Sequence, residues 1–251
     1  MAFALSEYDP KLPTEPFEPA ESDHFNADPK SASGTVFLQS VANGGPTPRG
    51  VVLWTRLDAS VYQEDELLAV EVGTDSDFAD IVYQEAVEAD AIGPAYDCTV
   101  HVELSGLLEP NSEYYYRFVC RNTRSRTGRC RILPQANASP SRIRFGVIAC
   151  QDYQNGYYGA YHHLADADID FLVHLGDFIY NSAAGQFRGL GSEAYPDREI
   201  SLPSDHDPAW TLADFRELYR TYLSTPALQR ALERHTLIRT WDDHAVANNR
   251  Y

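Results

Sequence analysis

Side chains of the types that bind metal ions follow three separate apolar segments. Cys150 ends the run IRFGVIAC, Asp177 and Tyr180 follow FLVHLG, and Asp243 and His244 follow HTLIRTWD. If these segments are parallel strands, their carboxyl ends meet at one edge of a sheet, where functional groups gather. We therefore expect the five side chains to converge on one site.

The mixture of donor types indicates which ions such a site would bind. Carboxylate and amide oxygens suit hard cations such as calcium. A thiolate and a phenolate are anionic when bound and suit a more Lewis-acidic transition ion such as iron. Two ions about 3.5–4 Å apart, bridged by one aspartate, would polarise a phosphoryl oxygen and activate a water molecule.

Each residue also has a simpler interpretation when it is taken alone. Cys150 would then be a buried cysteine at a strand end, and Tyr180 a packing tyrosine. Asp242 could cap a helix in the loop that follows, so we assign no metal to it. The functional hypothesis rests on the set of residues and on their order.

The elements that must position this set follow a strand–helix–strand rhythm. Ile143–Cys150 is a nearly continuous apolar run, which predicts a strand buried on both faces. Residues 157–168 have helical spacing, and Asp170–Asp177 predicts a second buried strand. Three such elements in about 35 residues predict two parallel strands joined by a right-handed crossover.

Two helices and a third strand are expected after a long polar loop. Thr211 and Asp214 form a capping box for a helix that runs to Tyr222. Thr225 caps the next helix, with Pro226 at its first position. HTLIRTWDD then predicts a strand that delivers the DDH triplet.

The N-terminal part has a different pattern of expected secondary structure, with short strands and no helices. Residues 1–34 are expected to form an extended arm, and residues 134–141 a linker. Residues 35–133 contain about seven short strands in about 100 residues, typical of a β-sandwich of the fibronectin or immunoglobulin type. In the stretch LSGLLEPNSEYYYRF, a tyrosine near the start of a predicted strand matches the buried corner tyrosine of such domains. An unrelated all-β module of similar size is the alternative.

The composition excludes several kinds of partner. The 251 residues carry a net charge of −17, which argues against binding to a nucleic-acid backbone or an anionic membrane. No apolar stretch approaches the roughly 20 residues of a membrane span. Of the 20 basic residues 18 are arginines, and this acidic, lysine-poor composition favours adaptation to high salt. Coding bias in a GC-rich genome is the alternative.

Four cysteines are too few for a disulfide scaffold in a chain of this size. Cys120 and Cys130 flank a short basic segment and could meet across a hairpin. The alternative is that they are buried small hydrophobic residues, which is the favoured interpretation for Cys98.

From Val36 to the end, the sequence resembles the PhoD-like alkaline phosphatase family, a branch of the calcineurin-like metallophosphoesterases. FGVIACQDYQNGYYGAYHHLADADIDFLVHLGDFIY and RTWDDHAVANN carry the resemblance, through the GDxxY and WDDH motifs in that order. VFLQSVANGGPTPRGVVLWTRL is similar to the N-terminal sandwich domain of that family.

The resemblance implies a ligand set for ferric iron and calcium. Cys150 and Tyr180 correspond to iron ligands, and Asp177 to the ligand that bridges the ions. Asp243 corresponds to a ligand on the calcium side, and Asn248 matches an asparagine that also reaches calcium.

The resemblance also implies an activity. His244 corresponds to a histidine that stabilises the charged transition state or protonates the leaving group. The implied reaction is hydrolysis of a phosphate mono- or diester, with a small phosphate ester as the partner. The sequence departs from the family at Ala245 and Asn181, where acidic residues are usual, and this weakens the expected support of the ligands.

In the family, the phosphoesterase domain continues well beyond WDDH. Residues 142–251 are therefore expected to form the first half of that domain. They offer about five protein groups, whereas each octahedral ion needs about six ligands. We expect this polypeptide to be an incomplete form of the enzyme with little phosphatase activity alone, and a downstream C-terminal half to be its partner.

One non-enzymatic interpretation and two locations stay open. The sandwich could be a binding module attached to a degenerate, non-catalytic phosphoesterase fragment. Members of the family are typically exported, yet no signal peptide is visible in the first 25 residues. We expect an exported or cell-surface protein, with a cytoplasmic one as the alternative.

Overall fold

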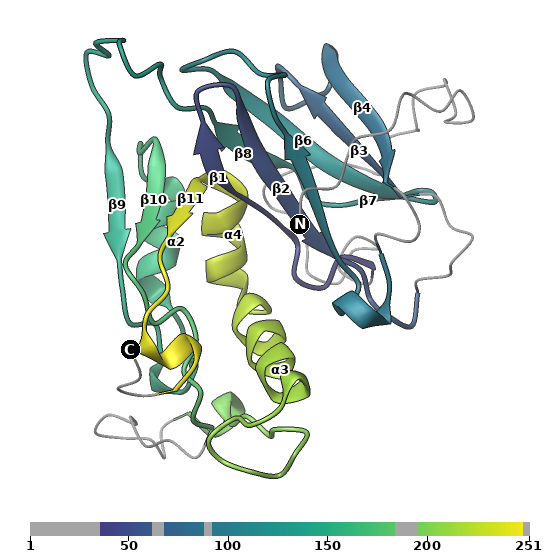
Figure 1. Cartoon of the computed structure of the whole chain (residues 1–251), viewed down its shortest axis with the longest axis vertical. Helices are drawn as coiled ribbons and strands as arrows, with labels where there is room; N and C mark the ends of the chain where they lie inside the picture. The colour runs from purple at the N-terminus through teal and green to yellow at the C-terminus, as the bar shows by residue number, and fades with distance from the viewer. Residues whose placement is uncertain (1–35, 62–67, 88–91, 184–194, 248–251) are drawn as a thin grey trace. The chain divides into compact units, whose positions relative to one another are not determined.

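The computed structural model describes residues 36–61, 68–87, 92–183 and 195–247, so the expected arm at residues 1–34 lies outside the described part. The chain divides into two compact units (Figure 1). The first unit contains the chain up to Ile143 together with Leu232–Leu237. The second unit contains Arg144–Ala231 and the chain from Ile238 onward.

The first unit is built from short strands in two sheets. Its strands are β1 (Val41–Thr47), β2 (Gly50–Arg56), β3 (Leu68–Gly73), β4 (Ile81–Val87), β5 (Thr99–Leu104), β6 (Glu113–Cys120), β7 (Thr123–Arg124) and β8 (Gly128–Arg131). In one sheet β2 pairs antiparallel with β1 and β5, and in the other β3 pairs with β4 and β6, while β7 and β8 pair with β6.

A single hydrophobic core takes side chains from both sheets. Leu53 of β2 stands opposite Val102 of β5, and Val70 of β3 stands opposite Phe118 of β6. All four side chains are buried and belong to this core. In β5 buried and more exposed residues alternate, so one face of this strand points into the core.

The corner tyrosine that the sequence indicated is Tyr114, at the second position of β6. Its ring is buried, and its hydroxyl accepts a hydrogen bond of 3.1 Å from the backbone N–H of Glu109. This bond closes the corner that leads into β6, as in the tyrosine corners of β-sandwiches.

The hairpin interpretation of Cys120 and Cys130 is wrong. Cys130 stands opposite Tyr114 in the β6–β8 pairing, whereas Cys120 stands opposite Thr123 of β7, so the two cysteines are at different levels of the sheet. Both are free and buried, as is Cys98. Burial raises the pKa of the Cys130 thiol to about 12, and these three cysteines behave as small hydrophobic residues.

The second unit contains the predicted strand–helix–strand arrangement. Its elements are β9 (Phe145–Ile148), α2 (Gly159–Asp166), β10 (Phe171–His174), α3 (Leu212–Leu223), most of α4 (Pro226–Arg234) and the end of β11 (Thr236–Arg239). Strands β9 and β10 pair in parallel, and β10 is followed by β11 in the strand order (Figure 1). The carboxyl ends of these strands therefore lie at one edge.

The prediction that Ile143–Cys150 is buried on both faces is wrong. Strand β9 stands at the end of the strand order, and Phe145 and Val147 are 50% and 58% exposed. In contrast, Phe171 and Leu172 of the neighbouring strand β10 are fully buried. An apolar run shows that a strand suits a buried position, but it does not show which faces are covered.

Both predicted helix starts are confirmed. Thr211 caps α3: its hydroxyl accepts from the backbone N–H of Asp214, and the Asp214 carboxylate accepts from the backbone N–H of Thr211. Helix α4 begins at Pro226, whose missing N–H costs nothing at a first helical position.

We predict that Thr211→Ala lowers the free energy of unfolding by about 1 kcal/mol, because it leaves the backbone N–H of Asp214 without its side-chain acceptor. Urea unfolding followed by circular dichroism measures the loss. Thr221→Ala, in the last turns of the same helix, is the matched control, because alanine is favourable inside a helix. Equal stability of the two variants would contradict the capping role.

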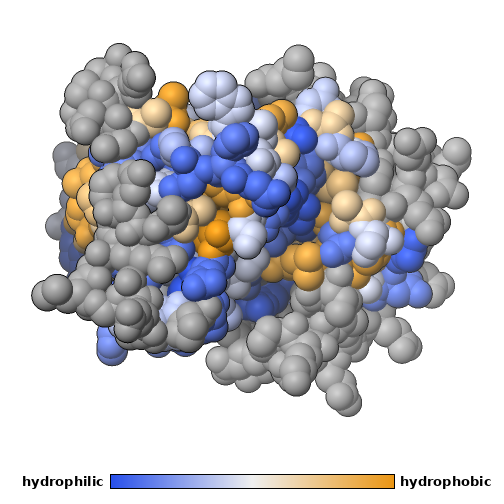
Figure 2. Space-filling view, turned by 90° about the horizontal axis from the view of Figure 1, so that it is seen from below, coloured by the Kyte–Doolittle hydropathy of each residue, from blue (hydrophilic) through white to orange (hydrophobic). Residues whose placement is uncertain are grey.

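The surface mixes polar and apolar residues. In the view from below, hydrophilic and hydrophobic residues are interspersed (Figure 2). Trp210 and Trp241 are among the exposed large hydrophobic residues of the second unit. Among the described residues, no helix is long and apolar enough to cross a membrane.

Candidate metal centre

Asp177 lies at the centre of the predicted site, in the turn that follows β10. The preceding residue, Gly176, has a positive φ of 128°, and a Cβ atom added there would lie 2.5 Å from the Cβ of Asp242. Glycine is therefore required for the close approach of the two segments that end β10 and β11. This close approach explains why a glycine precedes Asp177 in the GD pair of the sequence.

The thiol of Cys150 and the phenol of Tyr180 both contact the Asp177 carboxylate. The Cys150 Sγ atom is 3.6 Å from Asp177 Oδ2, and the Tyr180 hydroxyl is 3.3 Å from the same oxygen. The backbone holds these groups in place, because the N–H of Cys150 donates to the carbonyl of Gly176, and that of Gln151 to the carbonyl of Asp177. The loops after β9 and β10 are thus joined at the site.

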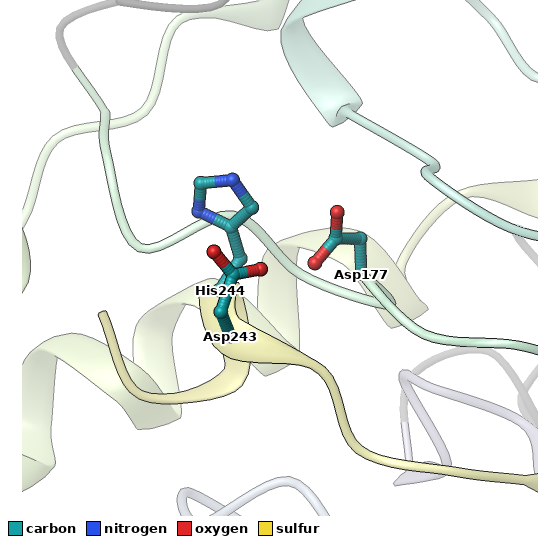
Figure 3. Close-up of side chains that lie close together, drawn as sticks. All are labelled: Asp177, Asp243 and His244. Carbon is teal, nitrogen blue, oxygen red and sulfur yellow. The ribbon is translucent and has the colours of Figure 1, made fainter. Parts of the chain in front are cut away.

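The segment after β11 brings Asp243 and His244 to the same place. Ligand atoms of Asp177, Asp243 and His244 all lie within 4.8 Å of one another. The carboxylates of Asp177 and Asp243 face each other, although they come from different segments (Figure 3). Asp242 accepts a hydrogen bond from the backbone N–H of Asp243 and so has the capping role that the sequence left open.

The burial and hydrogen bonding of Asp177, Cys150 and Tyr180 fit a bound cation. Asp177 is buried, and its Oδ1 atom finds no hydrogen-bond partner among the described residues. Burial raises the pKa of the Cys150 thiol, and it raises that of the Tyr180 phenol more strongly, with the Asp177 charge acting in the same direction. A cation would supply the partner that Oδ1 lacks and would favour the thiolate and phenolate forms.

His244 is held by a residue that the sequence marked only as a departure from the family pattern. Its Nδ1 atom is 3.0 Å from Oδ1 of Asn181, and its ring lies 4.4 Å from the ring of Tyr180. Because an amide oxygen can only accept, Nδ1 of His244 carries the hydrogen in this contact. Asn181 therefore fixes the orientation and the tautomer of the imidazole.

Five of the six predicted site residues are brought together. The sixth, Asn248, lies outside the described residues, so its role stays a prediction. Ala245, the other departure, lies in the short helical turn Asp243–Ala245 and has no side-chain donor or acceptor to offer.

Sequence analysis missed the residue that supports this site from α3. Tyr222 is fully buried, and its hydroxyl accepts a hydrogen bond of 3.2 Å from the backbone N–H of Tyr180. It also contacts the carboxylate of Asp152. The helical period could have shown that Tyr222 lies on the buried face with Leu218, but not that it reaches a loop 42 residues away in the chain.

A cavity of about 510 Å³ opens beside the candidate metal ligands Cys150, Asp177, Tyr180 and Asp243, which we call the metal-ligand cluster. Cys150, Tyr180 and His244 are among its lining residues. The wall continues along Gly156 and Tyr158 to the start of α2. Clefts of this size hold small organic ligands, so the site has room for more than a phosphate group.

The chain is similar to known proteins over most of its length. A family model described as the PhoD-like phosphatase, N-terminal domain, matches residues 22–134, and one described as the PhoD-like phosphatase matches residues 145–251. Alkaline phosphatase D of Bacillus subtilis (strain 168) is 34% identical over 230 residues, which cover 89% of this chain. A solved structure of PhoD is 33% identical, with a TM-score of 0.70 over 88% of this chain.

The match covers a part of these relatives. The chain spans 37% of the Bacillus subtilis protein and 41% of the PhoD chain in the solved structure. The similarity therefore includes both units described here and the residues of the metal-ligand cluster, within proteins that are more than twice as long.

Proposed function

The chain belongs to the PhoD-like phosphatase family, and from this premise we propose that its metal centre hydrolyses phosphate mono- or diesters. The observation that supports this proposal most directly is the convergence of a thiol, a phenol and a second carboxylate on Asp177. A buried carboxylate oxygen without a hydrogen-bond partner, surrounded by such donors, is a typical metal-binding arrangement.

The donor types suggest which residues hold which ion. Cys150 and Tyr180 would hold ferric iron, because thiolate and phenolate suit a Lewis-acidic transition ion. Asp243 would hold calcium, and Asp177 would serve both ions. When bound, the ions would polarise the phosphoryl group and activate a water molecule. Asn248 is kept in the proposal as a further calcium ligand.

His244 is proposed as the residue that acts on the reacting phosphoryl group or its leaving oxygen. The contact with Asn181 holds the ring, so that Nε2 is the nitrogen that can exchange a proton. In its protonated form the imidazole can stabilise negative charge or donate to the departing alkoxide. Both roles need a fixed ring, and the tilted contact with the Tyr180 ring also helps to hold it.

Because the candidate donors are fewer than two octahedral ions need, we expect slow hydrolysis, and a single-turnover assay with the chain in excess over p-nitrophenyl phosphate is sensitive enough to measure it. We expect p-nitrophenolate release from the chain loaded with ferric iron and calcium, and none after treatment with a chelator. His244→Gln is expected to lower the rate by about 100-fold, within the usual range for the loss of a general acid or base. Its metal content should stay within twofold of the original.

The same experiment separates the enzyme from the non-catalytic alternative. A degenerate fragment would bind metal weakly or would bind it without releasing p-nitrophenolate, and either result would contradict the proposal. Iron bound through Tyr180 should also give a visible ferric–phenolate absorption that Tyr180→Phe removes. An exported or cell-surface location remains part of the proposal.

A further inference from the structure

The wall of the cavity beside the metal-ligand cluster is fixed by a buried arginine outside the cavity. Arg198 is 5% exposed and lies in the short helical turn Pro196–Arg198. Its Nε and Nη2 atoms both donate to the carbonyl of Gly156, with an Nε–oxygen distance of 2.9 Å. Its Nη1 atom donates to the hydroxyl of Thr225.

The guanidinium of Arg198 also lies against three tyrosine rings. Its central carbon is 3.8 Å from the ring centroid of Tyr153 and 5.1 Å from those of Tyr157 and Tyr158. The adjacent Asp197 accepts a hydrogen bond from the Tyr157 hydroxyl. These contacts tie the turn Pro196–Arg198 to the loop that carries the cavity wall.

Two of the residues that Arg198 contacts also line the cavity. Gly156 and Tyr158 lie in its wall, and Gly159 and Ala160 at the start of α2 continue that wall. Tyr158 precedes α2 in a left-handed conformation, with φ at 59° and no side-chain cap. Its position therefore depends on contacts from outside the helix, and Arg198 makes one of them.

The lining shows what kind of group the cavity would accept. The rings of Tyr158 and Tyr161 pack at 5.6 Å, and both residues lie in the lining together with Tyr180. Aromatic walls of this kind bind planar or apolar groups through their faces and edges.

We propose that this cavity receives a ring-bearing alcohol portion of the substrate, and that Arg198 is the positioning residue that holds its wall. This inference rests on the proposed function, because the phosphoryl group of the same ester would lie at the metal-ligand cluster. The planar guanidinium donates to one carbonyl with two nitrogens while it stacks on tyrosine rings, and a lysine ammonium cannot do both.

Binding of two phosphonates, which are not hydrolysed, tests the inference in the metal-loaded chain. Methylphosphonate reaches the metal centre alone, whereas phenylphosphonate adds a ring. We expect phenylphosphonate to bind about tenfold more tightly, as burial of part of a ring predicts. In Arg198→Lys this preference should fall to about twofold or less. Isothermal titration calorimetry measures both affinities.

A second variant tests the cavity without touching Arg198. A Cβ atom added at Gly159 would meet nothing within 4 Å, so a larger side chain there can enter the open space without a clash. Gly159→Leu should therefore fold normally and reduce the preference for phenylphosphonate by partly filling the cavity. Arg230→Lys is the matched control, because Arg230 pairs with the exposed Asp166 elsewhere in the second unit.

The outcomes are distinct from those of the hydrolysis assay. Loss of the ring preference in Arg198→Lys and Gly159→Leu, but not in Arg230→Lys, supports the inference even if the chain hydrolyses no ester. Equal affinities of the original chain for the two phosphonates would overturn it, as would an unchanged preference in both variants. An equal loss of both affinities in Arg198→Lys would show a general structural role and would also overturn the positioning role.

Discussion

Asp177→Asn is expected to abolish the proposed iron binding and, with it, the proposed phosphoester hydrolysis. The carboxylate contacts Cys150 and Tyr180 through one oxygen and lies next to Asp243, so its removal takes away the group that the other donors share. Loss of a residue that merely supports a ligand lowers metal affinity by about 10- to 100-fold. The loss of the shared ligand itself should exceed that range.

Metal content after desalting and the single-turnover rate measure this effect. Asp166→Asn is a suitable control, because Asp166 is an exposed aspartate on α2 that pairs with Arg230. Its variant should bind iron as the original chain does. If Asp177→Asn retained both iron and hydrolysis, Asp177 would not be the shared ligand, and the assignment of the whole centre would be wrong.

Arg126→Met is expected to destabilise the first unit by about 3–5 kcal/mol, the usual cost of removing one partner of a buried ion pair. Its partner, Glu233, lies near the end of α4 in the segment that belongs to the first unit, and its side chain is completely buried. Arg126 Nη1 is 3.0 Å from the Glu233 carboxylate, which also accepts from the hydroxyl of Ser40. Without Arg126 the buried carboxylate would keep its charge unpaired.

The pH dependence of this loss has a defined sign. Burial raises the pKa of Glu233 above its ordinary value of 4.5, against the opposing effect of Arg126. Its contribution to stability is therefore fully present below the unfolded-state pKa and is lost as the pH rises through the folded-state pKa. Removal of Arg126 raises the folded-state pKa further. Urea unfolding should thus show a larger loss in Arg126→Met at pH 7 than at pH 4.

Two further variants isolate the charge on Glu233 as the cause. Arg126→Met combined with Glu233→Gln should recover most of the lost stability, because the unpaired buried charge is gone. Arg230→Met breaks an exposed pair and should cost no more than about 1 kcal/mol. If the double variant were as unstable as Arg126→Met alone, packing rather than charge would explain the loss.

Much of the site was predictable because its residues follow regular elements at fixed offsets. Parallel strands end at a common edge, so Cys150, Asp177 and Asp243 could be expected to converge from their positions after three apolar runs. The capping box of Thr211 and Asp214 was predictable because it depends on residues three positions apart. The corner tyrosine likewise forms a local bond over five residues.

The rest depended on contacts between residues far apart in the chain. The apolar run of β9 did not reveal that Phe145 and Val147 are exposed, because burial depends on which elements cover a face. Asn181 looked like a loss of support until the structure placed its amide against His244. Arg198 had no local signal, since its role comes from stacking on tyrosines about 40 residues earlier in the chain.

The sequence alone determined the local elements and the chemical types of the groups at their ends, because periodicity and short-range hydrogen bonds act over a few residues. The tertiary structure decided which oxygen of Asp177 is shared, which residue orients His244 and what shapes the neighbouring cavity. Those features depend on distances of a few ångströms between segments that the chain separates by tens of residues.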